Sequence, residues 1–281
     1  MQVRIPRIDY SQVRAHWAPN HEFAQHHNAS STIPVYVEPF LIRLLNKAKT
    51  LIDPSEVALL QAVDIFSKQE GQHFQQHAAF NKTLYAQGYT KLPELEQSLK
   101  NDMAEFLAKK SLKFNLAYAE GFEAMGPPSA AVWFEESDAF LEGADAEAVD
   151  LWKWHMAEEF EHRRVCFDLY HKLYSKGPIN AILNGWFYRV YGFVFALGHL
   201  GKYIKTVSHY LIEKDRETMT EAELKVSRER LNLVLAAIRR NMLPRFLHVL
   251  SPFYNPTHKR TPKGLLEFLK RFEPGGDRAA A

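Results

Sequence analysis

The chain has 281 residues, of which 46% are hydrophobic and 24% charged, so it can bury a substantial core and is not mainly disordered. Lys and Arg total 35 against 33 Asp and Glu, and this formal net charge of +2 gives no reason to expect nucleic acid as a partner. Cys166 is the single cysteine, which excludes an internal disulfide and a cysteine-based zinc module. Histidine and carboxylate side chains must therefore supply the ligands of any metal.

The first residues lack the apolar stretch of a secretory signal, so we expect a cytoplasmic location. Residues 179–204 are apolar and aromatic but include Arg189 near their middle. An arginine at the bilayer centre costs roughly 2.5–3.5 kcal/mol on insertion scales, so we expect a buried helix here rather than a membrane span. Contact with lipid by this segment and by residues 259–271 is a further alternative, which would place the protein peripherally at the inner membrane.

Helical spacing dominates and sustained strand alternation is absent, so we expect an all-α fold. Asp53 and Pro54 open one of the expected helices, and Gly88 is placed to end it. Thr220 opens the last of them with a capping box. The expected helices cover, in chain order, residues 35–52, 54–87, 94–125, 145–176 and 220–242.

Two glycine-proline signals divide the chain. Gly126, followed by two prolines, is expected to end the third helix, and Gly177-Pro178 the fourth. We expect residues 1–177 to form a helical bundle with an N-terminal extension, and residues 178–281 to form an aromatic and basic helical region packed on it, with a disordered tail from about residue 274. Four irregularly spaced histidines are expected on a surface segment of the extension: His16, His21, His26 and His27.

Ionisable residues interrupt the apolar stripes that should face the core. Two helices carry Glu-x-x-His in mid-stripe, and two others carry a glutamate. Converging buried carboxylates need cations, and this order along the chain is that of carboxylate-bridged dimetal bundles. The alternative is a partly solvated helix face with ion pairs. The proposed metal ligands are Glu38, Glu70, His73, Glu120, Glu159 and His162.

Other residues near these positions leave alternatives open. Glu123 competes with Glu120, because both suit the same helix face. His77 and His155 lie in the same stripes. For each of them three roles stay open: an additional metal ligand, a residue that hydrogen-bonds to a ligand, or a histidine of the core. A further pair points away from the stripe and is expected to be solvated: Glu158 and Glu161.

Three stretches carry a resemblance to a known family: residues 69–77, 119–122 and 154–168. They resemble the bacterial predicted metal-dependent hydrolases, a family that is similar to the ferritin-like superfamily. The resemblance implies a ferritin-like four-helix bundle with a dimetal core and additional C-terminal helices. The chain departs from the family pattern where Pro39 follows Glu38, which predicts a helix start or kink there, and where Tyr254 replaces a histidine.

Three functions follow as hypotheses. Histidine and carboxylate ligands suit iron or manganese, and the ferritin-like resemblance implies a di-iron oxidoreductase that uses dioxygen, as an oxygenase or oxidase, on a small, largely apolar substrate. Manganese and zinc are the alternative metals. The family description implies a dimetal hydrolase instead. The third hypothesis is a non-catalytic, membrane-associated bundle that binds metal for stability.

Two further expectations concern the substrate and the partners. No nucleotide or flavin fingerprint is present, so the reductant is expected to be a separate electron-donor protein. A homodimer is left open. An aromatic segment is expected to line part of the substrate pocket: Trp186, Phe187, Tyr188, Tyr191, Phe193 and Phe195.

Overall fold

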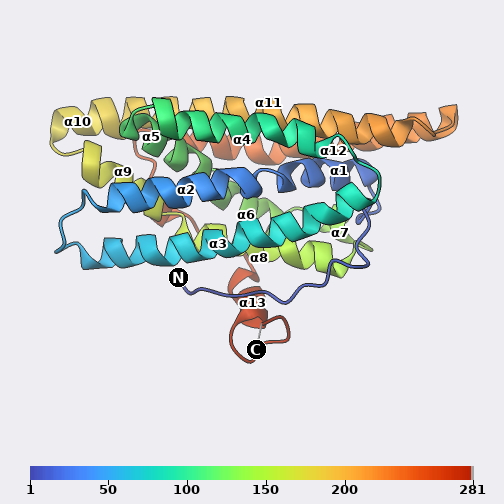
Figure 1. Cartoon of the computed structure of the whole chain (residues 1–281), viewed down its shortest axis with the longest axis horizontal. Helices are drawn as coiled ribbons and strands as arrows, with labels where there is room; N and C mark the ends of the chain where they lie inside the picture. Colours follow the sequence, from blue (N-terminus) through green and yellow to red (C-terminus); the bar gives the residue numbers. More distant parts are fainter. Residues whose placement is uncertain (280–281) are drawn as a thin grey trace.

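The computed structural model describes residues 1–279, and over these residues the chain forms helices and no strand (Figure 1). The expected all-α class is therefore confirmed for the described chain. Four helices surround the buried centre of the molecule and carry the ionisable stripes. They are α2 (Pro34–Lys49), α3 (Val57–Ala86), α5 (Leu112–Glu123) and α8 (Ala146–His162).

The expected helix over residues 94–125 is two helices, α4 (Leu92–Lys109) and α5. Ser111 separates them, and its side chain accepts a hydrogen bond from the Phe114 backbone N–H, which starts α5 afresh. Gly126 does not end the helical region as expected. It begins α6 (Gly126–Glu135), where the two prolines occupy the first turn, which has no helical partner for an N–H group.

The expected helix over residues 145–176 is likewise two helices, α8 and α9 (Val165–Tyr174). Asp145 caps α8 by accepting from the backbone N–H groups of Glu147 and Ala148. At the break, the Arg163 guanidinium donates to the carbonyl of Phe160, which a continuing helix would use for its own ladder. A short helix, α7 (Asp138–Leu141), lies between α6 and α8.

The N-terminal extension contains a core helix that the sequence did not predict, α1 (His21–Ser31). Its N-cap, Asn20, accepts from the Phe23 backbone N–H, and Asn28 accepts from Trp17 Nε1 at 2.9 Å. The expectation of a surface segment was therefore wrong for α1, because Phe23 and Asn28 are buried in the core. His16, which precedes the helix, lies at the surface 2.8 Å from Asp215.

The C-terminal region begins with α10 (Pro178–Ile182), a π-helical turn over Leu183–Tyr188 and the long helix α11 (Arg189–Arg216). Helix α11 lies directly on α5: a Cβ on Gly192 would come within 2.3 Å of the Ala117 carbonyl oxygen, and one on Gly121 within 2.6 Å of Phe193 Cα. Larger residues at either glycine would force the helices apart. Among the helices of residues 1–279, none combines the length and the apolar composition of a transmembrane span.

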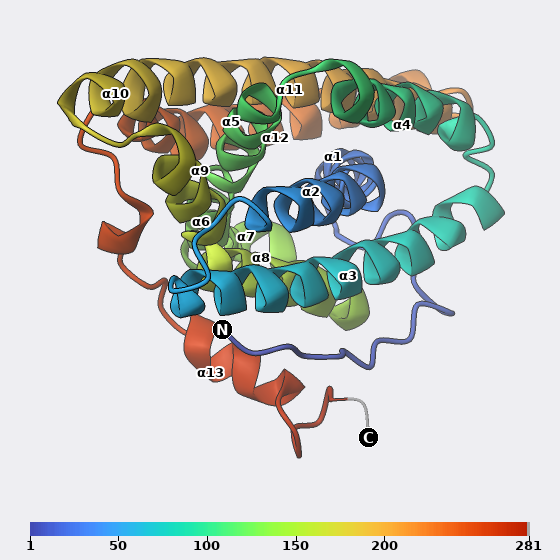
Figure 2. The same cartoon turned by 60° about the vertical axis from the view of Figure 1, so that its left-hand side comes forward.

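Helix α12 (Glu221–Val249) runs back beside α11, as Figures 1 and 2 show. Its capping box at Thr220 forms as expected, but the helix continues through Pro244 rather than ending near residue 242. A 3₁₀ turn (Pro256–His258), α13 (Leu265–Leu269) and a second 3₁₀ turn (Lys270–Phe272) follow.

The last part of the chain packs against α8. Arg278 pairs with Glu147 at 2.8 Å and with Asp150 at 2.8 Å, so the described part of the tail, to residue 279, is held in place where composition predicted disorder. Residues 280–281 of that predicted tail lie outside the described residues.

Candidate metal centre

Seven ionisable side chains from four helices meet in the interior, and each is at most 3% exposed. They form two groups whose donor atoms lie within 4.8 Å of one another, and one glutamate belongs to both groups. The first group is Glu38, His73, His155 and Glu159. The second group is Glu70, Glu123, Glu159 and His162.

The first group is centred on the carboxylate oxygens that face His155. His155 Nε2 lies 3.0 Å from Glu159 Oε1 and 3.4 Å from Glu38 Oε1. His73 Nδ1 completes the group at 3.6 Å from Glu159 Oε1. Three helices, α2, α3 and α8, therefore each direct at least one donor to the same point.

The second group is centred on His162. Its Nε2 lies 3.2 Å from Glu70 Oε1, 3.3 Å from Glu159 Oε2 and 3.4 Å from Glu123 Oε2. Here α3, α5 and α8 supply the donors.

Glu70 and Glu159 connect the two groups. Glu159 directs Oε1 to His155 and Oε2 to His162. Glu70 directs Oε1 to His162 and Oε2 to His73 Nδ1, the latter at 3.5 Å. Both glutamates of the Glu-x-x-His sequences thus lie between the two groups, as carboxylates that bridge two ions would.

The donor set fits two divalent cations. Metal bonds to histidine and carboxylate are about 2.0–2.2 Å long, which puts neighbouring donors on one ion about 3.0–3.5 Å apart, as they are here. Both oxygens of three glutamates, together with His73 Nδ1 and His162 Nε2, lack a hydrogen-bond partner within residues 1–279 although they are buried. Two divalent ions would satisfy these atoms and balance the four carboxylates. The three glutamates are Glu38, Glu70 and Glu123.

The pKa shifts show that the protein alone does not balance the negative charge of the cluster. Burial raises the pKa of Glu38 and Glu123 well above the usual range, and neighbouring carboxylates add to the shift. Burial also raises the pKa of Glu70. Burial opposes ionisation of Glu159 as well, but the charges of His162 and His155 and their hydrogen bonds to Glu159 together outweigh burial and hold the Glu159 pKa well below its usual range. Three of the four carboxylates are therefore poorly compensated by the protein alone.

Glu38 reaches the cluster in spite of Pro39. Helix α2 begins at Pro34, so Pro39 lies in its second turn and costs the helix one hydrogen bond without ending it. Glu38 is fully buried inside this helix and faces His155.

Glu120 lies outside both groups, and Glu123 takes the place on α5. Glu120 Oε1 accepts from Arg189 Nη1 at 3.4 Å, and Arg189 also donates to the Val249 carbonyl at 2.6 Å. Burial raises the Glu120 pKa to about 7, and Arg189 opposes the rise. The structure thus pairs Glu120 with an arginine from α11 and leaves Glu123 for the cluster.

The two uncertain histidines differ in position. His155 belongs to the first group, whereas His77 lies outside both and supports His155. His77 Nε2 is 2.6 Å from His155 Nδ1, and His77 Nδ1 is 2.8 Å from Ser31 Oγ, which donates to Asn81 Oδ1. This chain of hydrogen bonds fixes the ring of His155 with Nε2 toward the carboxylates.

Glu158 is fully buried, so the expectation that it is solvated was wrong. It lies 3.1 Å from His73 Nε2 and accepts from Arg4 Nη1 at 3.0 Å. Arg4 also donates to Glu161, which is only partly exposed. The N-terminal segment, whose role the sequence did not reveal, therefore supplies the cation that neutralises Glu158 behind His73.

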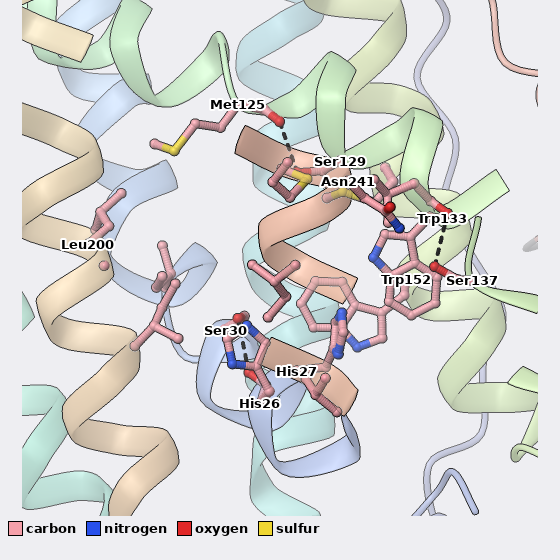
Figure 3. Close-up of a pocket in the computed structure, with 18 of the residues that line it drawn as sticks. His26, His27, Ser30, Met125, Ser129, Trp133, Ser137, Trp152, Leu200 and Asn241 are labelled. Atoms are coloured by element: carbon pink, nitrogen blue, oxygen red, sulfur yellow. Dashed lines mark hydrogen bonds between the residues drawn. The ribbon is translucent and has the colours of Figure 1, made fainter. Parts of the chain in front are cut away.

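A cavity of about 530 Å³ reaches the cluster at His155 and Glu159. Figure 3 shows side chains from several helices facing it, including Trp133, Trp152 and His27. Gly126 also lines the cavity, and a Cβ there would lie 3.0 Å from Glu159 Oε2, so the glycine leaves room for that carboxylate.

The cavity differs from the expected pocket. None of the six aromatic residues expected from the segment 186–195 is among the cavity residues. Helix α11 contributes instead through its next turns, from Leu197 to Ser208, because Phe193 packs against α5 and Tyr191 faces outward.

A sequence model of one family matches residues 2–260, nearly the whole chain, and that family is described as predicted metal-dependent hydrolase. The chain belongs to this family. No curated protein and no solved structure matches it. The family description and the two buried groups agree on a metal-dependent protein, in line with the resemblance noted in the sequence.

Proposed function

We propose that this member of the family is a dimetal enzyme that uses dioxygen to oxidise a small, largely apolar molecule. The observation that carries the proposal is the convergence of one glutamate from α2, one from α5, and a Glu-x-x-His pair from each of α3 and α8. Di-iron and di-manganese carboxylate bundles use this same distribution of ligands over four helices. Iron is the metal we propose, with manganese as the alternative.

Two iron ions held by these residues would supply the electrons and the binding site for dioxygen. The chain itself has three tasks. Glu70 and Glu159 hold the two groups together, and His77 keeps His155 in position. Trp133 and Trp152, stacked with centroids 5.6 Å apart, form an apolar wall of the cavity and limit the entry of water.

The shape of the cavity supports a small, largely apolar substrate. Its volume of about 530 Å³ lies within the range of ligand sites, and most of its lining side chains are apolar. A few polar groups that could orient a substrate interrupt this lining, among them Ser30, Ser129 and Asn241. The deep end of the cavity meets Glu159, so a bound molecule would lie against the ligand cluster.

A dimetal hydrolase is the second candidate, and the family description favours it. Hydrolysis develops negative charge on the substrate, and hydrolytic sites commonly place cationic or N–H donors against that charge. The one lysine or arginine that lines the cavity is Lys205, which lies at its exposed end rather than beside the ligands. The metal ions alone would have to stabilise the developing charge.

Metal loading separates the two candidates. We expect purified protein to bind about two Fe(II) ions per chain under anaerobic conditions and then to consume dioxygen, measured with an oxygen electrode. The same protein loaded with Zn(II) is tested against a panel of esters, amides and phosphoesters. Tight Zn(II) binding with turnover of one of these substrates, and no consumption of dioxygen by the iron form, would replace the oxidase by the hydrolase.

A further inference from the structure

The exposed end of the cavity lies between α11 and α12. Only three of the residues that line the cavity are exposed, and they face one another across these two helices: Gly201 and Lys205 on α11, and Leu235 on α12. The start of α11 and the end of α12 are held together by two contacts. Trp186 Nε1, just before α11, donates to the Leu250 carbonyl at 2.9 Å, and the Phe193 and Phe246 rings lie 5.8 Å apart.

Apolar side chains surround this opening on the outer surface. On α11, Val194 precedes Gly201 at helical spacing and is 53% exposed. On α12, Leu235 and Leu243 are 45% and 51% exposed. Figures 1 and 2 both place α11 at the outer edge of the molecule with α12 beside it. We call the following five residues the mouth surface: Val194 and Lys205 on α11, and Leu235, Arg239 and Leu243 on α12.

The charge along the middle parts of α11 and α12 is positive, although both helices carry acidic residues at their adjoining ends. The sequence has no Asp or Glu over residues 169–212, which contain five Lys and Arg, and none over residues 230–266, which contain seven. Lys205 and Arg239 are exposed within the mouth surface. The chain as a whole is nearly neutral, so these two stretches are more basic than the rest of it, although Arg245 on α12 pairs with Glu136 and His199 on α11 lies 3.1 Å from Asp102.

We infer that the mouth surface docks on an anionic lipid bilayer. Exposed apolar side chains flanked by lysine and arginine are the features by which helices bind in the interface of an anionic membrane without crossing it. The apolar surface continues into the cavity, so a lipophilic molecule could pass from the bilayer to Glu159 without entering water. This route, unlike the docking itself, rests on the proposed function.

A second copy of the chain fits the same surface less well. In a two-fold dimer through the mouth surface, Lys205 and Arg239 of one chain would lie close to the same two residues of the other chain. Like charges that face each other across an interface cost several kcal/mol, whereas anionic lipid headgroups attract both patches. Charge complementarity therefore favours the bilayer.

Vesicle binding of the full chain tests the inference. We expect the protein to sediment with vesicles containing phosphatidylglycerol and to bind those of pure phosphatidylcholine far more weakly. The variant carrying Lys205→Gln and Arg239→Gln is expected to bind anionic vesicles at least tenfold more weakly, since each basic residue near the surface contributes about fivefold. A second variant, with Val194→Ser and Leu235→Ser, tests the apolar part.

The matched control carries Val57→Ser and Lys82→Gln on α3, which lies on the opposite side of the molecule from α11 (Figures 1 and 2). This control should bind vesicles as the unaltered protein does, and circular dichroism should show all three variants folded. Equal vesicle binding by all proteins, or none by the unaltered protein, would overturn the inference. So would a concentration-dependent dimer, seen by light scattering, that the mouth variants lose.

Metal content is measured on the same samples. Because the mouth surface contains none of the proposed ligands, failure of vesicle binding with two ions bound refutes only the docking. Vesicle binding without metal refutes only the proposed function.

Discussion

Two sets of buried glutamates in this protein differ in where their compensating charge comes from. Glu120 and Glu158 each contact an arginine from a distant part of the chain, Arg189 and Arg4. Within residues 1–279, the ion pairs of the metal-centre carboxylates are all with histidines. Glu120 and Glu123 show the difference on one helix, since they lie three residues apart, equally buried, and only Glu120 has an arginine.

The difference shows that the fold brings in a distant arginine for Glu120 and another for Glu158. Arg4 comes from the N-terminal segment and Arg189 from the start of α11, and both are themselves almost fully buried. No such side chain reaches Glu38, Glu70 or Glu123 within residues 1–279. Burial of an uncompensated carboxylate is costly, so these positions are built for ions taken from solution.

Loss of Glu159, the carboxylate that belongs to both groups, should have the largest effect on metal binding. We expect Glu159→Gln to reduce the metal content from about two ions per chain to well below one, because Glu159 faces both groups of donors. Glu123→Gln removes a ligand from the second group only, so about one ion should remain. Inductively coupled plasma mass spectrometry on metal-loaded protein measures both.

Glu120→Gln is the matched control for these variants, because it makes the same chemical change three residues from Glu123 on a residue that faces Arg189. Its metal content should equal that of the unaltered protein. If Glu120→Gln lost an ion and Glu123→Gln kept both, the division into arginine-paired and metal-binding glutamates would be wrong.

Removal of an arginine should be the next largest effect. Arg189→Met leaves Glu120 buried without its partner and also removes the hydrogen bond to the Val249 carbonyl, so we expect a loss of about 3 kcal/mol in the free energy of unfolding. Glu120→Gln should cost less than Arg189→Met, because the Arg189 guanidinium keeps the carbonyls of Val249 and Ser251 as acceptors and gains the amide oxygen in place of the carboxylate. Urea denaturation of metal-loaded protein measures both.

The double variant with Arg189→Met and Glu120→Gln distinguishes the pair from the separate side chains. We expect it to be more stable than Arg189→Met alone, because no carboxylate is left buried without a cation. Additive losses in the double variant would show that Arg189 acts only through its contact with the Val249 carbonyl, and that Glu120 does not depend on it.

The sequence predicted those parts of the site that depend on spacing within one helix. Glu70 with His73, and Glu159 with His162, were found because residues three apart share a helix face. His155 was left open, although it lies four residues before Glu159 on that same face. The choice between Glu120 and Glu123 could not be made, because both suit the face and the decision depends on Arg189, an arginine far along the chain.

The cavity could not be predicted for a similar reason. Helix α1 was missed because its sequence has few apolar residues, so its helical stripe is weak, yet Phe23 and Asn28 are buried by contacts with distant elements. The aromatic residues near Trp186 suggested a pocket, but the close approach of α11 to α5 at Gly192 takes Phe193 into the helix interface. In both helices, contacts with distant parts of the chain determine which side chains reach the cavity, and the spacing within one helix does not reveal these contacts.

Histidines extend the comparison of the two regions. In the metal centre, burial lowers the pKa of His162, but the charges of Glu159 and Glu70 outweigh burial and raise it. In the cavity wall, His27 packs against Trp133 and Trp152, and burial lowers its pKa to about 3, with a further contribution from the charge of His26. His27 therefore stays neutral in the folded protein at pH values where the unfolded chain binds a proton.

The smallest effect we predict follows from this difference. Between pH 6.5 and about 3 the unfolded state carries a proton on His27 that the folded state does not. The effect of His27 on the free energy of unfolding is therefore absent above pH 6.5, and the protein loses stability as the pH decreases through this range. His27→Gln should flatten the fall by less than about 1.4 kcal/mol per pH unit, the limit for one proton. Urea denaturation of both proteins between pH 7 and about pH 5 measures the slopes. Parallel slopes would show that His27 takes up a proton in the folded protein as readily as in the unfolded chain. The difference between the cavity wall and the metal centre would then not extend to their histidines.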